Sequence, residues 1–127
     1  MSDPTKGQVR QLTALAKLTE LALDARLAKL RIAAARRDAT RTALDTLNAP
    51  RPEPEGDVAL SALARSNLLY DQWAEHQRRD LTLKLARDTA HWMEERSGAA
   101  TAFGRHDVLG RLTDDLKNRL ARLPPKS

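Results

Sequence analysis

Three histidines and two adjacent carboxylate pairs are the side chains of this sequence that could bind a metal ion or transfer protons. His76, His91 and His106 are fifteen residues apart, and this spacing turns each about 60° from the previous one on a helix. His91 has Asp88 and Glu95 within about one turn, but two ligands on an isolated helix do not complete a metal site. We therefore expect no metal centre, and interpret these residues as solvated polar groups or contacts at the edge of a helix interface.

The carboxylate pairs, Glu94-Glu95 and Asp114-Asp115, are poor candidates for acid–base catalysis. Neighbouring residues on a helix point about 100° apart, so the two carboxylates of one pair do not share a site. The chain has no glycine-rich phosphate loop after a strand and no nucleophile motif. A pair of helices also offers no concave pocket for a substrate. We expect a protein that is not an enzyme and that binds no cofactor.

The prolines indicate which elements must position the other residues. All of them lie at the start, in the middle or at the end of the chain, which leaves stretches of 45 and 69 residues without proline. A proline inside a helix costs about 3 kcal/mol, and both stretches are rich in Ala, Leu and charged residues. Each stretch is therefore expected to be helical. The prolines are Pro4, Pro50, Pro52, Pro54, Pro124 and Pro125.

These stretches predict one domain, a helical hairpin that spans residues 1–127. Asp3 is expected to cap the first helix, which stops before Pro50 because a residue that precedes proline is forced out of the helical region. The connection alternates proline with charge, which favours an extended chain, and Asp57 is expected to cap the second helix. The expected segments are a helix over about 4–48, a turn over 49–57 and a helix over about 58–123.

Gly98 and Gly104 leave the course of the second helix open. Each glycine costs a helix about 1 kcal/mol relative to alanine, so a break near 98–104 would give a kink or a short third helix. Strong helix formers between the two glycines favour a continuous or kinked helix that overhangs the first one; they are Ala99, Ala100 and Ala102. The fold class expected is all-α, an elongated antiparallel two-helix coiled-coil hairpin.

Charged and apolar residues recur at regular spacings. In the first helix a charge every seven residues predicts a solvent-exposed line. In the second helix, steps of seven and four predict an eleven-residue apolar repeat, in which Phe103 follows Trp92. The charged line is Arg10, Lys17, Asp24, Arg31, Asp38 and Asp45. The stripe expected to hold the hairpin together is Leu63, Tyr70, Ala74, Leu81, Leu85 and Trp92.

The leucines of the first helix wrap around most of its remaining surface. A two-stranded seam needs only a narrow stripe, so this distribution favours contact with more than one helix, either through self-association or through a partner. The candidate partner-binding residues on the second helix are an aromatic residue at the edge of the stripe and one face of the amphipathic C-terminal segment. They are Trp73, Arg105, Leu109, Leu112, Leu116, Arg119 and Leu120.

The net charge of +5 is unevenly distributed. Residues 1–49 carry +4 and residues 98–127 carry +3, whereas residues 50–57 carry −2, so a hairpin would have one basic end. Basic residues on one arc of the first helix could contact nucleic-acid phosphates, but leucines share the arc and no aromatic residue on this helix could stack on a base. The arc comprises Arg26, Lys29, Arg36, Arg37 and Arg41.

Three features that are absent from the sequence indicate where the protein is located. It has no cysteine, no apolar run of membrane-spanning length and no signal-peptide core at its N-terminus. A soluble cytoplasmic protein without a transmembrane segment is therefore expected.

The hairpin pattern, with a basic cysteine-free chain, an acidic proline-rich turn and a longer second helix, resembles the FliJ-type proteins of flagellar type III export. Three segments resemble divergent alphaproteobacterial members: DQWA at 71–74, LKLAR with TAHW between 83 and 92, and AFGR at 102–105. The resemblance implies a coiled-coil stalk that sits in the hexameric export ATPase at the flagellar base. It also implies contacts with export chaperones or the export gate, and no catalysis.

Two other functions stay open from the sequence. A secretion or export chaperone would cover a client helix with the amphipathic segment from Leu109 to Leu123. A nucleic-acid-associated helical protein would bind through the basic arc, and its affinity would fall steeply with salt.

Overall fold

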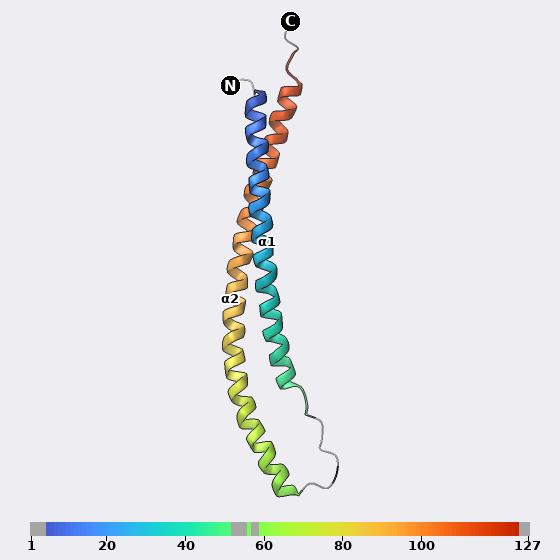
Figure 1. Ribbon diagram of the computed structural model, residues 1–127, viewed down its shortest axis with the longest axis vertical. Helices are drawn as coiled ribbons and strands as arrows, with labels where there is room; N and C mark the ends of the chain where they lie inside the picture. The colour runs from blue at the N-terminus through green and yellow to red at the C-terminus, as the bar shows by residue number, and fades with distance from the viewer. Residues whose placement is uncertain (1–4, 52–55, 57–58, 125–127) are drawn as a thin grey trace. The chain divides into compact units, whose positions relative to one another are not determined.

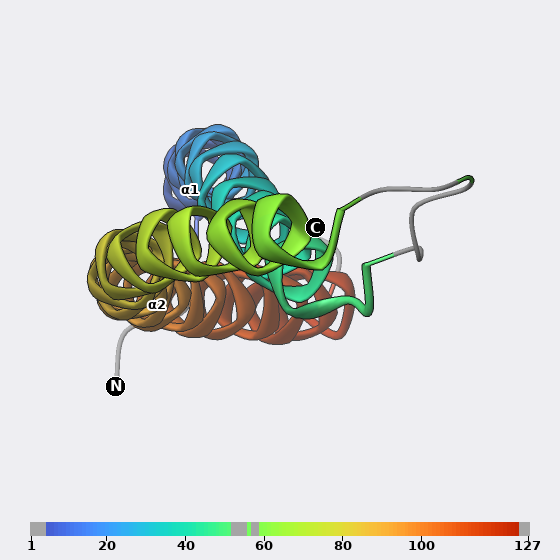
Figure 2. The same cartoon turned by 90° about the horizontal axis from the view of Figure 1, so that it is seen from below.

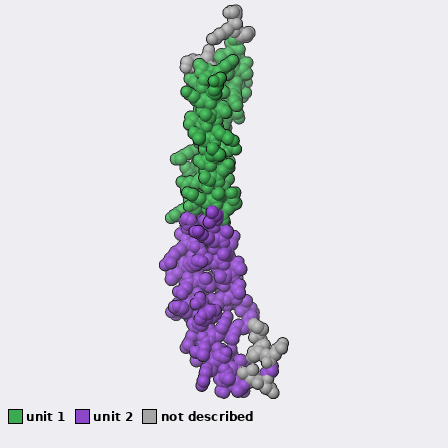
Figure 3. Space-filling view, in the orientation of Figure 1, with its two compact units in different colours: residues 1–31, 93–127 green, residues 32–92 purple. Residues whose placement is uncertain are grey.

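The computed structural model describes residues 5–51, 56 and 59–124. These residues form two α-helices, α1 (Lys6–Asn48) and α2 (Leu60–Ala121), and contain no strand (Figure 1). The predicted all-α helical hairpin is therefore confirmed. The chain divides into two compact units, and each contains a segment of both helices (Figure 3). Unit 1 is residues 1–31 with 93–127, and unit 2 is residues 32–92.

Thr5 caps the N-terminus of α1. The backbone N–H of Gln8 donates to Thr5 Oγ1 at 3.1 Å, and the backbone N–H of Thr5 donates to Gln8 Oε1 at 3.0 Å. This reciprocal pair is a capping box, which satisfies two donors at the helix start. The predicted cap, Asp3, and the predicted cap of α2, Asp57, both lie outside the described residues. The capping box shows that Thr5 has the role that we assigned to Asp3.

Within each unit, α1 and α2 lie side by side and run antiparallel (Figure 1, Figure 2). In unit 2, later residues of α1 contact earlier residues of α2, as antiparallel helices require. The same order is found in unit 1. The pairs are Arg37–Trp92, Thr40–Asp88 and Asn48–Arg78 in unit 2, and Thr19–His106 and Arg26–Glu95 in unit 1.

The expected overhang of the C-terminal part of α2 is wrong. In unit 1 a groove is lined jointly by Lys6 and Leu120, so the last turns of α2 lie beside the first turns of α1. In unit 2, α2 is instead extended at its N-terminal end. There Arg51, which follows the end of α1, stacks its guanidinium 3.8 Å from the ring centroid of Tyr70 and donates to Asn67. The extra length of α2 therefore lies at its start.

α2 continues as helix through Gly98 and Gly104. The described residues have positive φ only at Gly56, with a φ of 94°, so neither helical glycine has the left-handed geometry of a helix C-cap. The ending of α1 agrees with the prediction, since its last residue is Asn48. The proline two residues later accounts for this stop.

The contact between the helices follows a heptad pattern that includes polar residues. Phe103, predicted to lie on the stripe, is 59% exposed, so the eleven-residue repeat is wrong beyond Trp92. Buried and half-buried positions instead recur every seven residues in two series on each helix. On α1 they are Val9, Ala16, Leu23, Leu30, Arg37 and Leu44, with Leu12, Thr19, Ala33, Thr40 and Leu47; Arg26, at the remaining position of the second series, is exposed. On α2 they are Ala74, Leu81, Asp88, Glu95, Ala102, Leu109, Leu116 and Leu123, with Leu85, Trp92, Ala99, His106, Thr113 and Leu120.

We call these positions the seam. Its most buried apolar residues are all alanines: Ala33, Ala74 and Ala99 are 1%, 3% and 5% exposed. Two threonines, Thr40 and Thr113, are buried as deeply. Among the described residues no large side chain is fully buried. The remaining predicted seam residues are half-buried; they are Leu63, Tyr70, Leu81, Leu85 and Trp92.

Replacing Gly98 tests the continuity of α2. A Cβ added there would lie 3.2 Å from Arg26 Nη1, the mobile tip of a long side chain. We expect Gly98→Ala to raise the free energy of unfolding by about 1 kcal/mol, because alanine favours helix, as measured by urea denaturation followed by circular dichroism. Gly56→Ala is the control and should destabilise, since its φ disfavours a side chain. A loss of stability in Gly98→Ala would contradict the expectation that helix propensity outweighs the close contact with Arg26.

Replacing Thr40 tests the polar part of the seam. Its hydroxyl donates to Asp88 Oδ2 at 2.6 Å, and Thr40 is 2% exposed. Thr40→Val keeps the shape but removes a donor to a carboxylate, so we expect the free energy of unfolding to fall by about 1–3 kcal/mol. The matched control is Thr42→Val, because Thr42 is exposed on the same helix. Equal urea midpoints for the two variants would show that the hydrogen bond does not stabilise the fold.

Candidate interaction surface

Large apolar side chains remain exposed on the outer faces of both units. In unit 1 they include Leu15 and Leu18 of α1 and Val108 and Leu112 of α2, between 47% and 61% exposed. The predicted charged line of α1, from Arg10 to Asp45, is also exposed. The exposed leucines are consistent with the prediction that α1 contacts more than one helix, because α2 covers only the seam positions.

Three of the predicted partner-binding residues of α2 in unit 1 lie in a line. Arg105, Leu112 and Arg119 follow one another at seven-residue intervals, and all three are exposed. This spacing keeps them on one flank of the seam, and Val108 lies one turn from Leu112 on the same flank. Sequence reasoning assigned these three residues to partner binding, and the fold brings them together on one accessible surface.

Leu15 and Leu18 of α1 lie on the same side of unit 1 as Val108 and Leu112 of α2. A small hollow of about 410 Å³ is lined by Thr19 together with Arg105, Val108 and Leu109, so the Val108 flank of α2 borders α1 at Thr19. The hydroxyl of Thr19 also lies 3.1 Å from His106 Nδ1. In an antiparallel pair the same heptad flank of both helices faces one side. We call Leu15, Leu18, Val108 and Leu112 the apolar patch.

The other predicted partner-binding residues have different surroundings. Leu109, Leu116 and Leu120 are half-buried at seam positions of unit 1, beside α1. Trp73, in unit 2, is 53% exposed, and its ring centroid lies 5.6 Å from that of Tyr70. The structure therefore separates the C-terminal apolar residues into seam residues and one surface residue, Leu112.

The net charge of the chain belongs entirely to unit 1. This unit contains thirteen basic and eight acidic residues, whereas unit 2 contains nine of each. The ion pairs near the apolar patch, Arg111–Asp107 at 3.1 Å and Arg119–Asp115 at 3.2 Å, are exposed and stabilise little in water. These pairs compensate their own charges, so attraction of an acidic partner would come from the net charge of unit 1 as a whole.

Part of the basic arc of α1 faces α2. In unit 2 the guanidinium carbon of Arg37 lies 4.1 Å from the ring centroid of Trp92, a cation–π geometry. In unit 1, Arg26 Nη1 lies 3.9 Å from Glu95 Oε2. These arginines take part in the helix contact, so the arc is not one continuous surface for phosphates.

The histidines and carboxylates form no multidentate cluster in the part of the chain that the structure describes. His76 pairs with Asp80 at 3.5 Å on the surface of unit 2, and His106 occupies the seam of unit 1. No group of three or more potential metal ligands was found among these residues. Neither described helix is long and apolar enough to cross a membrane.

Comparison of the chain with protein-family models, with curated proteins and with solved structures gave no match. The interaction surface must therefore be interpreted from its own chemistry. Sequence reasoning missed Val108 as a surface residue and did not separate Leu15 and Leu18 from the seam leucines of α1. The available signal was a second apolar series on α1, Leu15, Leu18, Ala22 and Ala25, which lies beside the seam series.

Paired substitutions on α2 test which leucines belong to the seam. Leu112 is 47% exposed and lies on the flank, while Leu109 is half-buried. We expect Leu112→Lys to change the free energy of unfolding by less than about 0.5 kcal/mol. Leu109→Lys should lower it by about 1–2 kcal/mol, because burial of the leucine is lost and a charge enters the seam. Urea denaturation of both variants measures the difference, and the reverse order would contradict the register.

Proposed function

We propose that this chain is a non-enzymatic coiled-coil adaptor of a flagellar type III export apparatus, and that it binds the export ATPase. The resemblance of the sequence to FliJ-type proteins suggests the machine. The apolar patch of unit 1 supports binding as the activity, because exposed apolar surface flanked by charge is typical of a protein interface. Contacts with export chaperones or the export gate, and a cytoplasmic place at the flagellar base, belong to the same proposal.

The concentration of net charge in unit 1 carries the proposal furthest. A positive unit is drawn towards an acidic or polar partner before contact, and this steering raises the rate of association. Arg105 and Arg119 flank Leu112 on α2, so the surface combines an apolar anchor with long-range attraction. Both features are expected of a stalk that docks into a ring of subunits.

The two alternative functions receive less support. A chaperone that covers a client helix with the whole Leu109–Leu123 face would have to displace α1 from Leu109 and Leu116, because these residues are half-buried in the seam. A nucleic-acid-binding protein would use the basic arc, of which Arg37 is engaged with Trp92.

Co-purification of the full chain with the export ATPase of the same organism tests the proposal. We expect a complex at low salt that weakens as ionic strength rises. Combined Leu18→Lys and Leu112→Lys should weaken the complex by at least about tenfold, because both leucines belong to the apolar patch. The matched control is Leu69→Lys with Leu83→Lys, since these leucines are 60% and 59% exposed in unit 2. Absence of any complex with a folded helical protein would reject the export role.

A further inference from the structure

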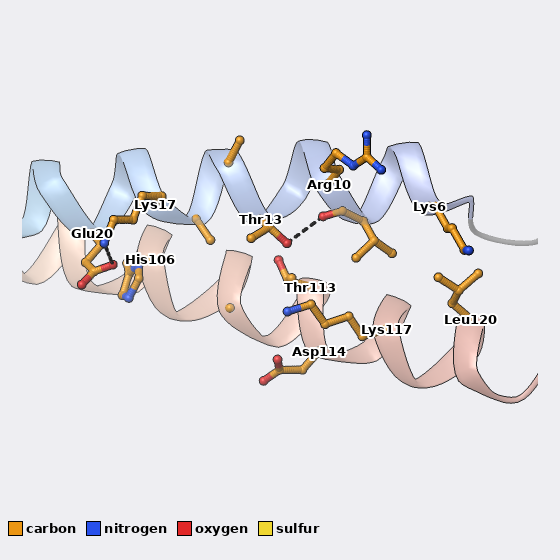
Figure 4. Close-up of a pocket in the computed structure, with 14 residues that line it drawn as sticks. Lys6, Arg10, Thr13, Lys17, Glu20, His106, Thr113, Asp114, Lys117 and Leu120 are labelled. Atoms are coloured by element: carbon orange, nitrogen blue, oxygen red, sulfur yellow. Dashed lines mark hydrogen bonds and ion pairs between the residues drawn. The ribbon is translucent and has the colours of Figure 1, made fainter.

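A second surface of unit 1 lies on the flank of the seam opposite the apolar patch. It is a groove of about 810 Å³ between the first turns of α1 and the last turns of α2 (Figure 4). Thr13 and Thr113 approach from the two helices in its middle (Figure 4). Its apolar lining includes Val9, Ala16 and Leu120, with Gly110 adding no side chain. Small residues at facing positions keep this space open.

The same groove is lined by charges that are mostly positive. Its basic side chains are Lys6, Arg10, Lys17 and Lys117, and its carboxylates are Glu20 and Asp114. Glu20 accepts from Lys17 at 3.4 Å. No carboxylate among the described residues pairs with Arg10 or Lys117, which come from different helices. We call this surface the basic groove.

We propose that the basic groove binds an acidic amphipathic helix of another protein. Such a helix would place apolar residues at i, i+3, i+4 and i+7 against the apolar lining and its carboxylates near Arg10 and Lys117. Unlike the patch, the groove pairs apolar lining with cations from both helices. The proposal is independent of the export apparatus, since it rests on the groove alone.

Charge distinguishes this occupant from the alternatives. A second copy of unit 1 would bring another +5 towards the groove, which opposes self-association through this face. Nucleic acid would meet two carboxylates and an apolar lining, and the groove has no Phe, Tyr or Trp on which a base could stack. An acidic helix satisfies both the apolar and the charged parts of the surface.

Binding of synthetic helical peptides to the full chain tests the proposal by fluorescence anisotropy. One peptide has leucine at i, i+3, i+4 and i+7 and glutamate at its flanking positions; the second has lysine in place of every glutamate. We expect the acidic peptide to bind at least about tenfold more tightly and to lose affinity as salt is added. Equal affinities, or no binding of the acidic peptide, would overturn the proposal.

Charge reversals locate the site. The double variant Arg10→Glu with Lys117→Glu should lower the affinity for the acidic peptide by at least about tenfold. Lys84→Glu with Arg87→Glu makes the same change in net charge, but in unit 2, and should leave the affinity within about twofold. An equal loss in both double variants would show that only net charge matters, and the assignment to the groove would be wrong.

Filling the groove gives a test that does not depend on charge. A Cβ added at Gly110 or at Gly104 meets no atom within 4 Å, so a side chain can begin at either position without a clash, and circular dichroism checks that both leucine variants are folded. Gly110 lines the basic groove, whereas Gly104 lines the hollow beside the apolar patch. Gly110→Leu should abolish binding of the acidic peptide and Gly104→Leu should preserve it. The opposite result would move the peptide to the apolar patch and overturn the proposal.

Discussion

The structure depends on small residues at the contact between the two helices. Ala33, Ala74 and Ala99 are the most buried apolar side chains among the described residues, and Thr40 and Thr113 are as deeply buried. Alanine permits close approach but removes little apolar area from water, at about 25 cal/mol per Å². Half-buried leucines must therefore supply most of the hydrophobic stabilisation. Other large apolar residues, such as Leu15, Leu18 and Leu112, lie beside the seam, which is why unit 1 presents an apolar surface to solvent.

A seam with so little large apolar area is well served by polar contacts that fix its register. Thr40 donates to Asp88 in unit 2, and Thr19 contacts His106 in unit 1. A slip of one heptad would preserve much of the apolar pattern but leave Asp88 or His106 without its partner. A polar group buried without a hydrogen bond costs about 1–3 kcal/mol, so these pairs favour one register over its neighbours. They make one register preferred in a helix contact whose apolar residues alone would allow several registers.

The sequence predicted the two helices and the end of α1 at Asn48, because proline acts on the backbone locally. It did not predict the seam beyond Trp92, because Glu95, His106 and Thr113 occupy seam positions while apolar Phe103 is exposed. Hydrophobic periodicity cannot identify polar seam positions; they follow only from the register of the two helices. For the same reason the sequence grouped the surface residue Leu112 with the seam residues Leu109 and Leu116.

The register also explains why unit 1 has two different surfaces. The seam divides each helix into two flanks, and antiparallel pairing brings like flanks together. One flank carries Leu15, Leu18, Val108 and Leu112, while the other carries small residues and the cations of the basic groove. A partner on one flank would not cover the other, although both would be attracted by the charge of the same unit. Because screening by salt acts on this shared charge, ionic strength should weaken both contacts, whereas Leu112 and Gly110 should affect one each. If substitution of Leu112 and substitution of Gly110 each abolish binding of a different partner, unit 1 has two binding surfaces and not one.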